Sequence, residues 1–421
     1  MLRHFFPGAL LAGFLYWETG DKAYRAHQTV AQSPSSWIGT ETAISGGGKT
    51  VTTVRGTVLG TKQPLQVGAP KGFADTDSVT LPGALSISPT GELAVADGES
   101  LVIFDAQGQF IRRVGRKGRG PGEFVRIHGL WFANRDSLLI WDGVQRRLTW
   151  MSSAPGHLPR AIPMRTSAAF GTPEQIQLVP LLDSVALAWA GSLVRPGGPP
   201  DSVLLSLHSL SEPTGSRSLA SLEGTSWKRY GPVPGPRYAF GPKTLFAVGR
   251  QGSVAFGDGV EYCFTLLATP QTANDPVSIC RRWARARLGR AKDDLAENQL
   301  VNKLPMASVL RQLVREQEYS RTRNSYDELL IDDRNQTWVR VVDSEHVFHP
   351  LLMRQVPELR PQAYSWDVFD VRGRLLATVL MPARFRPRAI GTTSIVGVFE
   401  EDDGRLTLSV TSIPAPLLTT R

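Results

Sequence analysis

A glycine-rich stretch at residues 115–124 places three basic side chains, Arg116, Lys117 and Arg119, among four glycines. Backbone N–H groups in such turns can converge on an anion, and guanidinium and ammonium groups would add charge. The glycines equally suit a tight crossing between two strand units, with Phe124 wedged between sheets and Glu123 accepting from nearby backbone amides. The structural interpretation is favoured, and the three basic residues remain the candidate binding residues.

Metal chemistry has two weak candidates. His346 and His349 stand three residues apart near Glu345 and Asp343, but this spacing in an extended strand puts the two rings on opposite faces. The acidic run at 400–403 lacks the alternating ligand spacing of a calcium loop and is better explained as a hairpin turn. The sequence therefore predicts no metal site in either place.

Phosphate and nucleophile motifs are equally weak. Residues 43–50 match a loosened phosphate loop, but a β-branched run follows where the motif needs a helix. No G-x-S-x-G elbow and no partnered reactive thiol occur. We therefore expect no catalytic residue set and no cofactor.

The two cysteines, Cys263 and Cys280, fall in apolar runs on either side of a loop at residues 269–276. The loop contains the midpoint between them, so the two residues would oppose each other in a hairpin, within disulfide range. A Cys263–Cys280 bridge is predicted, which would agree with export to an oxidising compartment. Two buried free thiols are the alternative.

The elements that position these residues are short strands. Apolar and polar residues alternate over four to six positions between turn formers, and the 40 glycines and 30 prolines favour many turns. The pattern defines six units of several strands, at about 83–115, 127–165, 176–222, 240–280, 328–380 and 389–413. Repeats of this kind are typical of a β-propeller, in which each sheet packs against its neighbours.

The last unit shows only two clear strands, 393–399 and 405–411. We expect strands from residues 49–67 to complete it, so that the two ends of the chain close the ring. Between the fourth and fifth units, residues 291–302 and 306–319 have helical spacing. A helical insertion at about 289–321 is therefore predicted to lie over one end of the ring as a lid.

The motif at 115–124, with the segment 365–373 and Met381-Pro382, resembles the NHL-type six-bladed β-propellers of bacteria, in particular uncharacterised exported ones. The resemblance covers about residues 51–414. It implies an all-β, six-bladed β-propeller that acts as a binding scaffold, and it supplies no catalytic residues.

The amino terminus suggests export. Residues 5–17 are mostly apolar, too short to cross a bilayer but suited to a secretory signal. We expect a signal peptide or anchor at 1–31, a flexible leader at 32–48 and the propeller at 49–421. The formal charge of +9 is dispersed and accompanies no recognition motif, so nucleic acid is not an expected partner.

The expected function is non-catalytic binding of a protein, peptide or glycan outside the cytoplasm, with a membrane-associated complex as one setting. The alternative is a metal-dependent hydrolase or lyase of the lactonase type, with an ion in the central channel. Its candidate ligands would be polar residues near strand ends, namely Glu92, Asn134, Asn274, Asp332 and Asn335.

Overall fold

A computed structural model describes segments of the chain between residues 41 and 419. The described residues are 41–45, 51–54, 64–67, 69–72, 79, 82–134, 137–152, 158–163, 172–180, 185–192, 202–209, 216–223, 225, 227–230, 233–239, 241–267, 276–281, 299, 301–303, 308–319, 324–342, 352–353, 356 and 359–419. The chain divides into two compact units, Met1–Ile38 and Gly39–Arg421, and every described residue lies in the second. The predicted signal or anchor therefore lies outside the described residues.

The described residues form six sheets of four to six strands and three two-stranded sheets. The first large sheet contains β5 (Pro82–Ile87), β6 (Leu93–Asp97), β7 (Ser100–Phe104) and β8 (Phe110–Val114). The second contains β11 (Ile127–Asn134), β12 (Ser137–Asp142), β13 (Arg147–Ser152) and β14 (Arg160–Pro163). The third contains β15 (Thr172–Pro180), β16 (Val185–Ser192), β17 (Ser202–Ser209) and β18 (Ser216–Glu223). The fourth contains β22 (Leu245–Val248), β23 (Val254–Gly257), β24 (Cys263–Leu267) and β25 (Val277–Cys280). The fifth contains β27 (Tyr326–Ile331), β28 (Thr337–Val341), β29 (Ala363–Phe369) and β30 (Leu375–Pro382). The sixth contains β31 (Phe385–Ile390), β32 (Ser394–Glu400) and β33 (Leu406–Ser412). These ranges agree with the predicted strand units to within a few residues.

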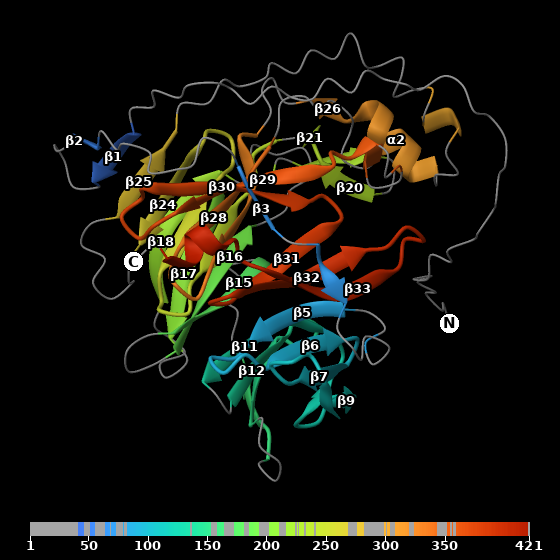
Figure 1. Cartoon of the computed structure of the whole chain (residues 1–421). Coiled ribbons are helices and arrows are strands. Elements are labelled where there is room, and N and C mark those ends of the chain that lie inside the picture. Colours follow the sequence, from blue (N-terminus) through green and yellow to red (C-terminus); the bar gives the residue numbers. More distant parts are fainter. Residues whose placement is uncertain are drawn as a thin grey trace. The chain divides into compact units, whose positions relative to one another are not determined.

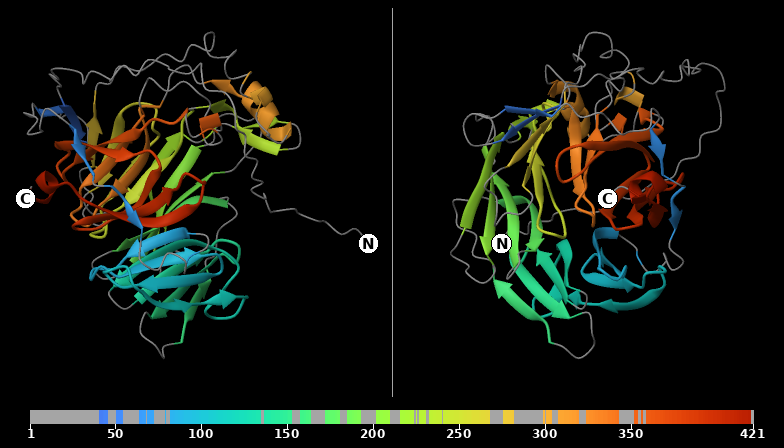
Figure 2. Two further views of the ribbon diagram at one scale, coloured as in Figure 1. Left: turned by 45° about the vertical axis from the view of Figure 1, so that its right-hand side comes forward. Right: turned by 60° about the vertical axis from the view of Figure 1, so that its left-hand side comes forward.

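The first strands of the six sheets contact one another in sequence. The order of contact is β5, β11, β15, β22, β27 and β31, and β31 in turn contacts β5. Figure 1 shows β5 beside β11 and β31, and Figure 2 gives two further views of the sheets. Sheets whose first strands meet in this way are the arrangement of a β-propeller. The chain is therefore an all-β protein with a β-propeller fold.

Apolar side chains fill the spaces between neighbouring sheets. In β6, Leu93 and Val95 pack towards the sixth sheet, whereas Ala94 and Ala96 pack towards the second. Successive side chains of a strand point to opposite faces, so β6 is buried on both sides. This explains why its sequence is a continuous apolar run rather than an alternating one.

The sixth sheet has one more strand than its sequence indicated. The prediction of only two strands in this unit was wrong, because β31 precedes them and pairs with β32. Arginine alternates with apolar residues in this strand, with Phe385 and Pro387 buried. Three arginines and a proline within seven residues concealed the strand pattern, since proline removes a ladder hydrogen bond.

The amino-terminal strands pair differently from the expectation. A short strand, β4 (Lys71–Gly72), pairs antiparallel with β33 of the sixth sheet. The prediction that residues 49–67 would do so was wrong for the described part of that segment. Within it, β3 (Leu65–Gln66) pairs parallel with β30, and β2 (Val51–Val54) pairs with β1 (Glu41–Ser45), which joins β25.

The region between the fourth and fifth sheets contains the helix α2 (Ser308–Glu316), within the predicted helical segment 306–319. Of the other predicted segment, 291–302, only residues 299, 301 and 302 are described, and they are helical. The helix contacts β19 (Trp227–Tyr230), which pairs with β20 (Val233–Pro236). The next strand, β26 (Glu318–Tyr319), pairs with β21 (Tyr238–Ala239).

A short helix, α4 (Ala415–Thr419), follows the sixth sheet. None of the helices in the described ranges is long and apolar enough to cross a membrane.

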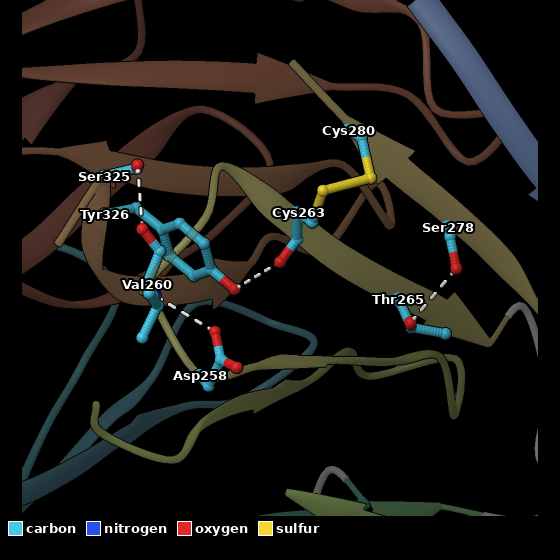
Figure 3. The surroundings of a disulfide bond; sticks show 8 residues. All are labelled: Asp258, Val260, Cys263, Thr265, Ser278, Cys280, Ser325 and Tyr326. Carbon is cyan, nitrogen blue, oxygen red and sulfur yellow. Dashed lines mark hydrogen bonds between the residues drawn. A yellow bond between two sulfur atoms is a disulfide. The ribbon is translucent and has the colours of Figure 1, made fainter. Parts of the chain in front are cut away.

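Cys263 and Cys280 are directly opposed on β24 and β25, and their sulfur atoms form a disulfide bond (Figure 3). The Tyr326 hydroxyl donates to the backbone oxygen of Cys263 at 2.7 Å. The bridge therefore lies where the fourth sheet meets the fifth. It joins two strands that the ladder already holds in register.

Reduction of this bridge is expected to lower the free energy of unfolding by about 3 kcal/mol, because the unfolded chain loses a closed loop of this length. Urea unfolding of the full chain with and without reductant measures the difference. The Cys263→Ser/Cys280→Ser variant is the control and should be insensitive to reductant. Two titratable thiols in the unreduced protein would contradict the bridge.

Candidate functional site

A cavity of about 390 Å³ lies where the first strands of five sheets approach one another. Its walls come from β5, β11, β22, β27 and β31 and from the turns that follow several of them. Much of the lining is strand backbone with aliphatic side chains. The titratable and aromatic residues at the wall are His128, Trp131, Phe132, Arg250, Asp333 and Arg388.

Five of the six first strands carry an irregularity, and three of these irregularities supply residues to this wall. These irregularities are β-bulges, and the extra residues are 83–84, Glu174, His128, Asp327 and Arg388. A bulged residue has no partner across the ladder, and the bulge re-aims its side chain. Ala84, His128 and Arg388 line the cavity.

The bulge at Arg388 depends on a glycine in the neighbouring strand. Gly397 of β32 is buried, and a side-chain β-carbon there would collide with the backbone of Arg386 and Pro387. Glycine therefore permits the close approach of β31 to β32. The position of Arg388 follows from this backbone packing.

Arg250 and Asp333 form an ion pair at one side of the cavity. The Arg250 Nε lies 3.0 Å from Asp333 Oδ1, and its Nη2 donates to the backbone oxygen of Ile87. Burial raises the pKa of the Asp333 carboxyl, and the positive charge of Arg250 opposes that shift. The pair links the turns after β22 and β27 to the end of β5, which is a structural role.

The glycine-rich stretch forms a folded crossing between the first and second sheets. Its strands β9 (Arg116–Lys117) and β10 (Glu123–Phe124) pair in parallel, and Phe124 is fully buried. Glu123 Oε2 accepts from the Gly120 N–H at 2.8 Å, as the structural interpretation predicted. This bond and the Arg116 guanidinium hold the pKa of the Glu123 carboxyl below its usual range.

The three basic residues predicted for binding lie on this crossing, away from the cavity lining. Arg116 pairs with Glu123 at 2.8 Å, and Lys117 lies 3.5 Å from Glu99. Arg119 is exposed, and its backbone oxygen accepts from Arg147 Nη1 at 2.6 Å. The structure does not bring these side chains together with the charged residues of the cavity.

Asp142 fixes the crossing to the second sheet. Its fully buried carboxylate accepts from the backbone N–H groups of Val125, Val144 and Gln145, at 2.7, 3.0 and 3.0 Å. Burial raises the pKa of this carboxyl, but the hydrogen bonds outweigh burial and hold it below its usual value. The charged form is therefore the one that the fold requires.

The residues considered as metal ligands have other partners or lie outside the described residues. Asp332 Oδ1 accepts from the backbone N–H groups of Arg334 and Gln336 at 3.0 and 2.7 Å, and its Oδ2 accepts from Trp338 Nε1 at 3.0 Å. Asn335 adopts a left-handed conformation and its side chain contacts Ser253. Glu92 closes a turn through backbone bonds with Ser88.

The remaining metal candidates are not described: Asn274, the Asn134 side chain, and residues 343–350 with both histidines. In the ranges that the structure covers, no three His, Cys, Asp or Glu residues gather as a metal ion would require.

The sequence analysis did not single out the four titratable cavity residues, His128, Arg250, Asp333 and Arg388. They lie far apart in the chain, and His128 and Arg250 belong to segments where a lone charge is typical of a strand end or turn. A bulge changes the face on which a residue lies without altering composition. The alternating arginines of residues 384–388 were the available signal.

A family model described as "6-bladed beta-propeller", DUF5128, matches residues 93–150, which run from β6 into β13. Among solved structures, a member of the DUF4221 family from Bacteroides vulgatus is 11% identical, with 83% of this chain and 97% of that chain covered and a TM-score of 0.49. A candidate exported protein from Bacteroides fragilis is 13% identical over 83% and 94% of the two chains, with a TM-score of 0.44.

The calcium-binding protein regucalcin from Agrobacterium tumefaciens is 9% identical over 83% and 94% of the two chains, with a TM-score of 0.39. No curated protein matches the sequence. All three TM-scores lie below 0.5, so no functional inference is drawn from these proteins.

Burial of Asp332 predicts a pH-dependent stability. The folded protein raises the pKa of this carboxyl from 3.8 to about 6, chiefly through desolvation. The stabilisation that the protonated Asp332 carboxyl gives the folded state is therefore fully present below about pH 4. It is lost as the pH rises through about 6, which lowers the free energy of unfolding by about 3 kcal/mol.

The difference in unfolding free energy between wild type and Asp332→Asn, measured in urea at several pH values, isolates this contribution. We expect the difference to fall from pH 4 to pH 7 on top of a constant offset, because asparagine does not ionise. A difference that is independent of pH would contradict the assignment.

Proposed function

We propose that this protein is a non-catalytic binding protein that acts outside the cytoplasm and holds its ligand in the cavity between the first strands. The observation that carries the proposal is the convergence of five strand segments on one cavity of about 390 Å³. That volume lies within the range of small-molecule sites, roughly 300–1,000 Å³. A small ligand, or the end of a peptide or glycan chain, would fit there.

The supporting scaffold is an NHL-type six-bladed propeller closed by β4. The pairing of Lys71 with Val410 and of Gly72 with Ser409 supports this closure, since it adds an amino-terminal strand to the carboxyl-terminal sheet. The helical insertion would cover the region near β19, with which α2 is in contact. A rigid ring of this kind displays loops and inner strands without moving them.

Location outside the cytoplasm is supported by the disulfide bond between Cys263 and Cys280. Disulfides persist mainly in oxidising compartments. The apolar segment at residues 5–17 adds a sequence argument for export, either with cleavage or as an anchor in a membrane-associated complex.

The hydrolase alternative is disfavoured by the contacts of its candidate ligands. Both carboxylate oxygens of Asp332 already accept hydrogen bonds from its own turn and from Trp338. A metal there would displace bonds that hold the turn. Lactone or ester hydrolysis that depends on added calcium and stops with a chelator would overturn the non-catalytic assignment.

Obstruction of the cavity tests the binding proposal. Arg388 is exposed at the cavity wall, so Arg388→Trp should fold and fill part of the space, whereas Arg372→Trp alters an exposed arginine on the turn before β30. Thermal-shift measurements of the full chain with neutral sugars, short peptides and organic acids should find a ligand that stabilises wild type and Arg372→Trp but not Arg388→Trp.

Equal stabilisation of both variants would place binding elsewhere. If no compound class stabilises the wild-type protein, the binding proposal fails.

A further inference from the structure

The cavity contains two arginines with different surroundings, and this difference bears on the ligand's charge. Arg250 is already committed, because Asp333 neutralises it and the Ile87 backbone oxygen accepts from it. A ligand that took Arg250 would have to displace a half-buried ion pair. Arg250 is therefore not the group that recognises an incoming anion.

The side chain of Arg388, in contrast, is available to bind an anion. In the part of the chain that the structure describes, no hydrogen bond or ion pair joins its side chain to another residue, and the side chain is exposed at the cavity wall. Arg386, two residues earlier in the same strand, instead pairs with Glu400 at 3.1 Å. The bulge separates these two roles, since it takes Arg388 out of the ladder while Arg386 remains paired with Val398.

His128 is the second bulged polar residue at the wall. Its Nδ1 lies 3.1 Å from both the Arg126 backbone oxygen and the Gly143 backbone nitrogen. In the neutral tautomer that carries its proton on Nε2, Nδ1 accepts from the Gly143 N–H. The described residues provide no partner for Nε2, which is left for solvent or a ligand.

The rest of the wall is suited to an apolar body. Leu85, Leu130 and Val248 contribute to it together with the half-buried ring of Trp131. A planar guanidinium forms paired hydrogen bonds with a carboxylate, and an uncommitted one in a partly enclosed site favours a single negative charge. A dianion would leave one charge without a partner.

We infer that the cavity binds a small organic acid, with its carboxylate on Arg388, a hydrogen bond from His128 Nε2, and its apolar body against Trp131 and the aliphatic wall. This inference rests on the proposed binding function and adds the chemical class of the ligand. The free acid could be a metabolite or the carboxyl end of a short peptide, because both present the same group.

Matched acids and amides test the charge requirement. Phenylacetate with phenylacetamide and butyrate with butyramide vary only the charged head group, and a dipeptide with a free or amidated carboxyl end tests the peptide source. Isothermal titration of the full chain should give at least one acid that binds tenfold or more tightly than its amide.

Variants separate charge from shape. Arg388→Gln should reduce binding of the acid to the level of its amide, Arg388→Lys should retain an intermediate affinity, and Arg372→Gln should bind as wild type does. His128→Phe should weaken binding of the acid severalfold and that of the amide less, because the hydrogen bond to a charged oxygen is the stronger one. Inorganic phosphate should bind more weakly than the acid.

The outcomes distinguish the inference from the proposed function. Equal binding of acid and amide, both lost in Arg388→Trp, would overturn the organic-acid assignment and leave the binding site in place. Acid binding that survives Arg388→Gln, or phosphate that binds as tightly as the acid, would also overturn the assignment. If no compound binds to the wild-type protein, the binding function fails as well.

Discussion

Apolar packing between the first and sixth sheets is the interaction on which the rest of the structure depends. Val102 and Phe104 of the first sheet share a buried cluster with Val396 and Leu408 of the sixth, although about 300 residues separate the two pairs along the chain. Burial of apolar surface stabilises a fold by about 25 cal/mol per Å² and is the dominant favourable term in folding. Because β31 contacts β5, the cavity is bounded by strands from both halves of the chain.

Within that rigid frame, small irregularities carry the chemistry. A regular strand would place Arg388 in the ladder, whereas the bulge, permitted by Gly397 on the neighbouring strand, frees its side chain for the cavity. The Arg250–Asp333 pair has the opposite role, since its charges tie the turns after β22 and β27 to each other and to the end of β5. Two arginines in one cavity thus have different functions, and their partners, rather than their residue type, decide which one is free to bind.

Sequence patterns were sufficient for most strands, for the opposed cysteines and for the role of Glu123, because alternation and turn residues are local signals. They were insufficient wherever the position of a residue depends on a strand that is distant in the chain. The amino-terminal strand that pairs with β33 has two residues, Lys71 and Gly72, which is too short for any periodicity to identify. Strand β31 was not recognised because three arginines lie in it or beside it. The bulges that bring His128 and Arg388 to the cavity depend on strand register, which composition does not encode.

The most direct measurement concerns the proposed closure, which is tested by cysteines at Lys71 and Val410. These residues are directly opposed in antiparallel strands, where α-carbons lie about 4.5–5.5 Å apart, within disulfide range. Under mild oxidation, peptide mapping of Lys71→Cys/Val410→Cys should recover a cross-linked pair, whereas Lys71→Cys/Leu406→Cys should not form one. Efficient cross-linking only in the second variant, or in neither, would contradict a ring closed by the amino-terminal strand.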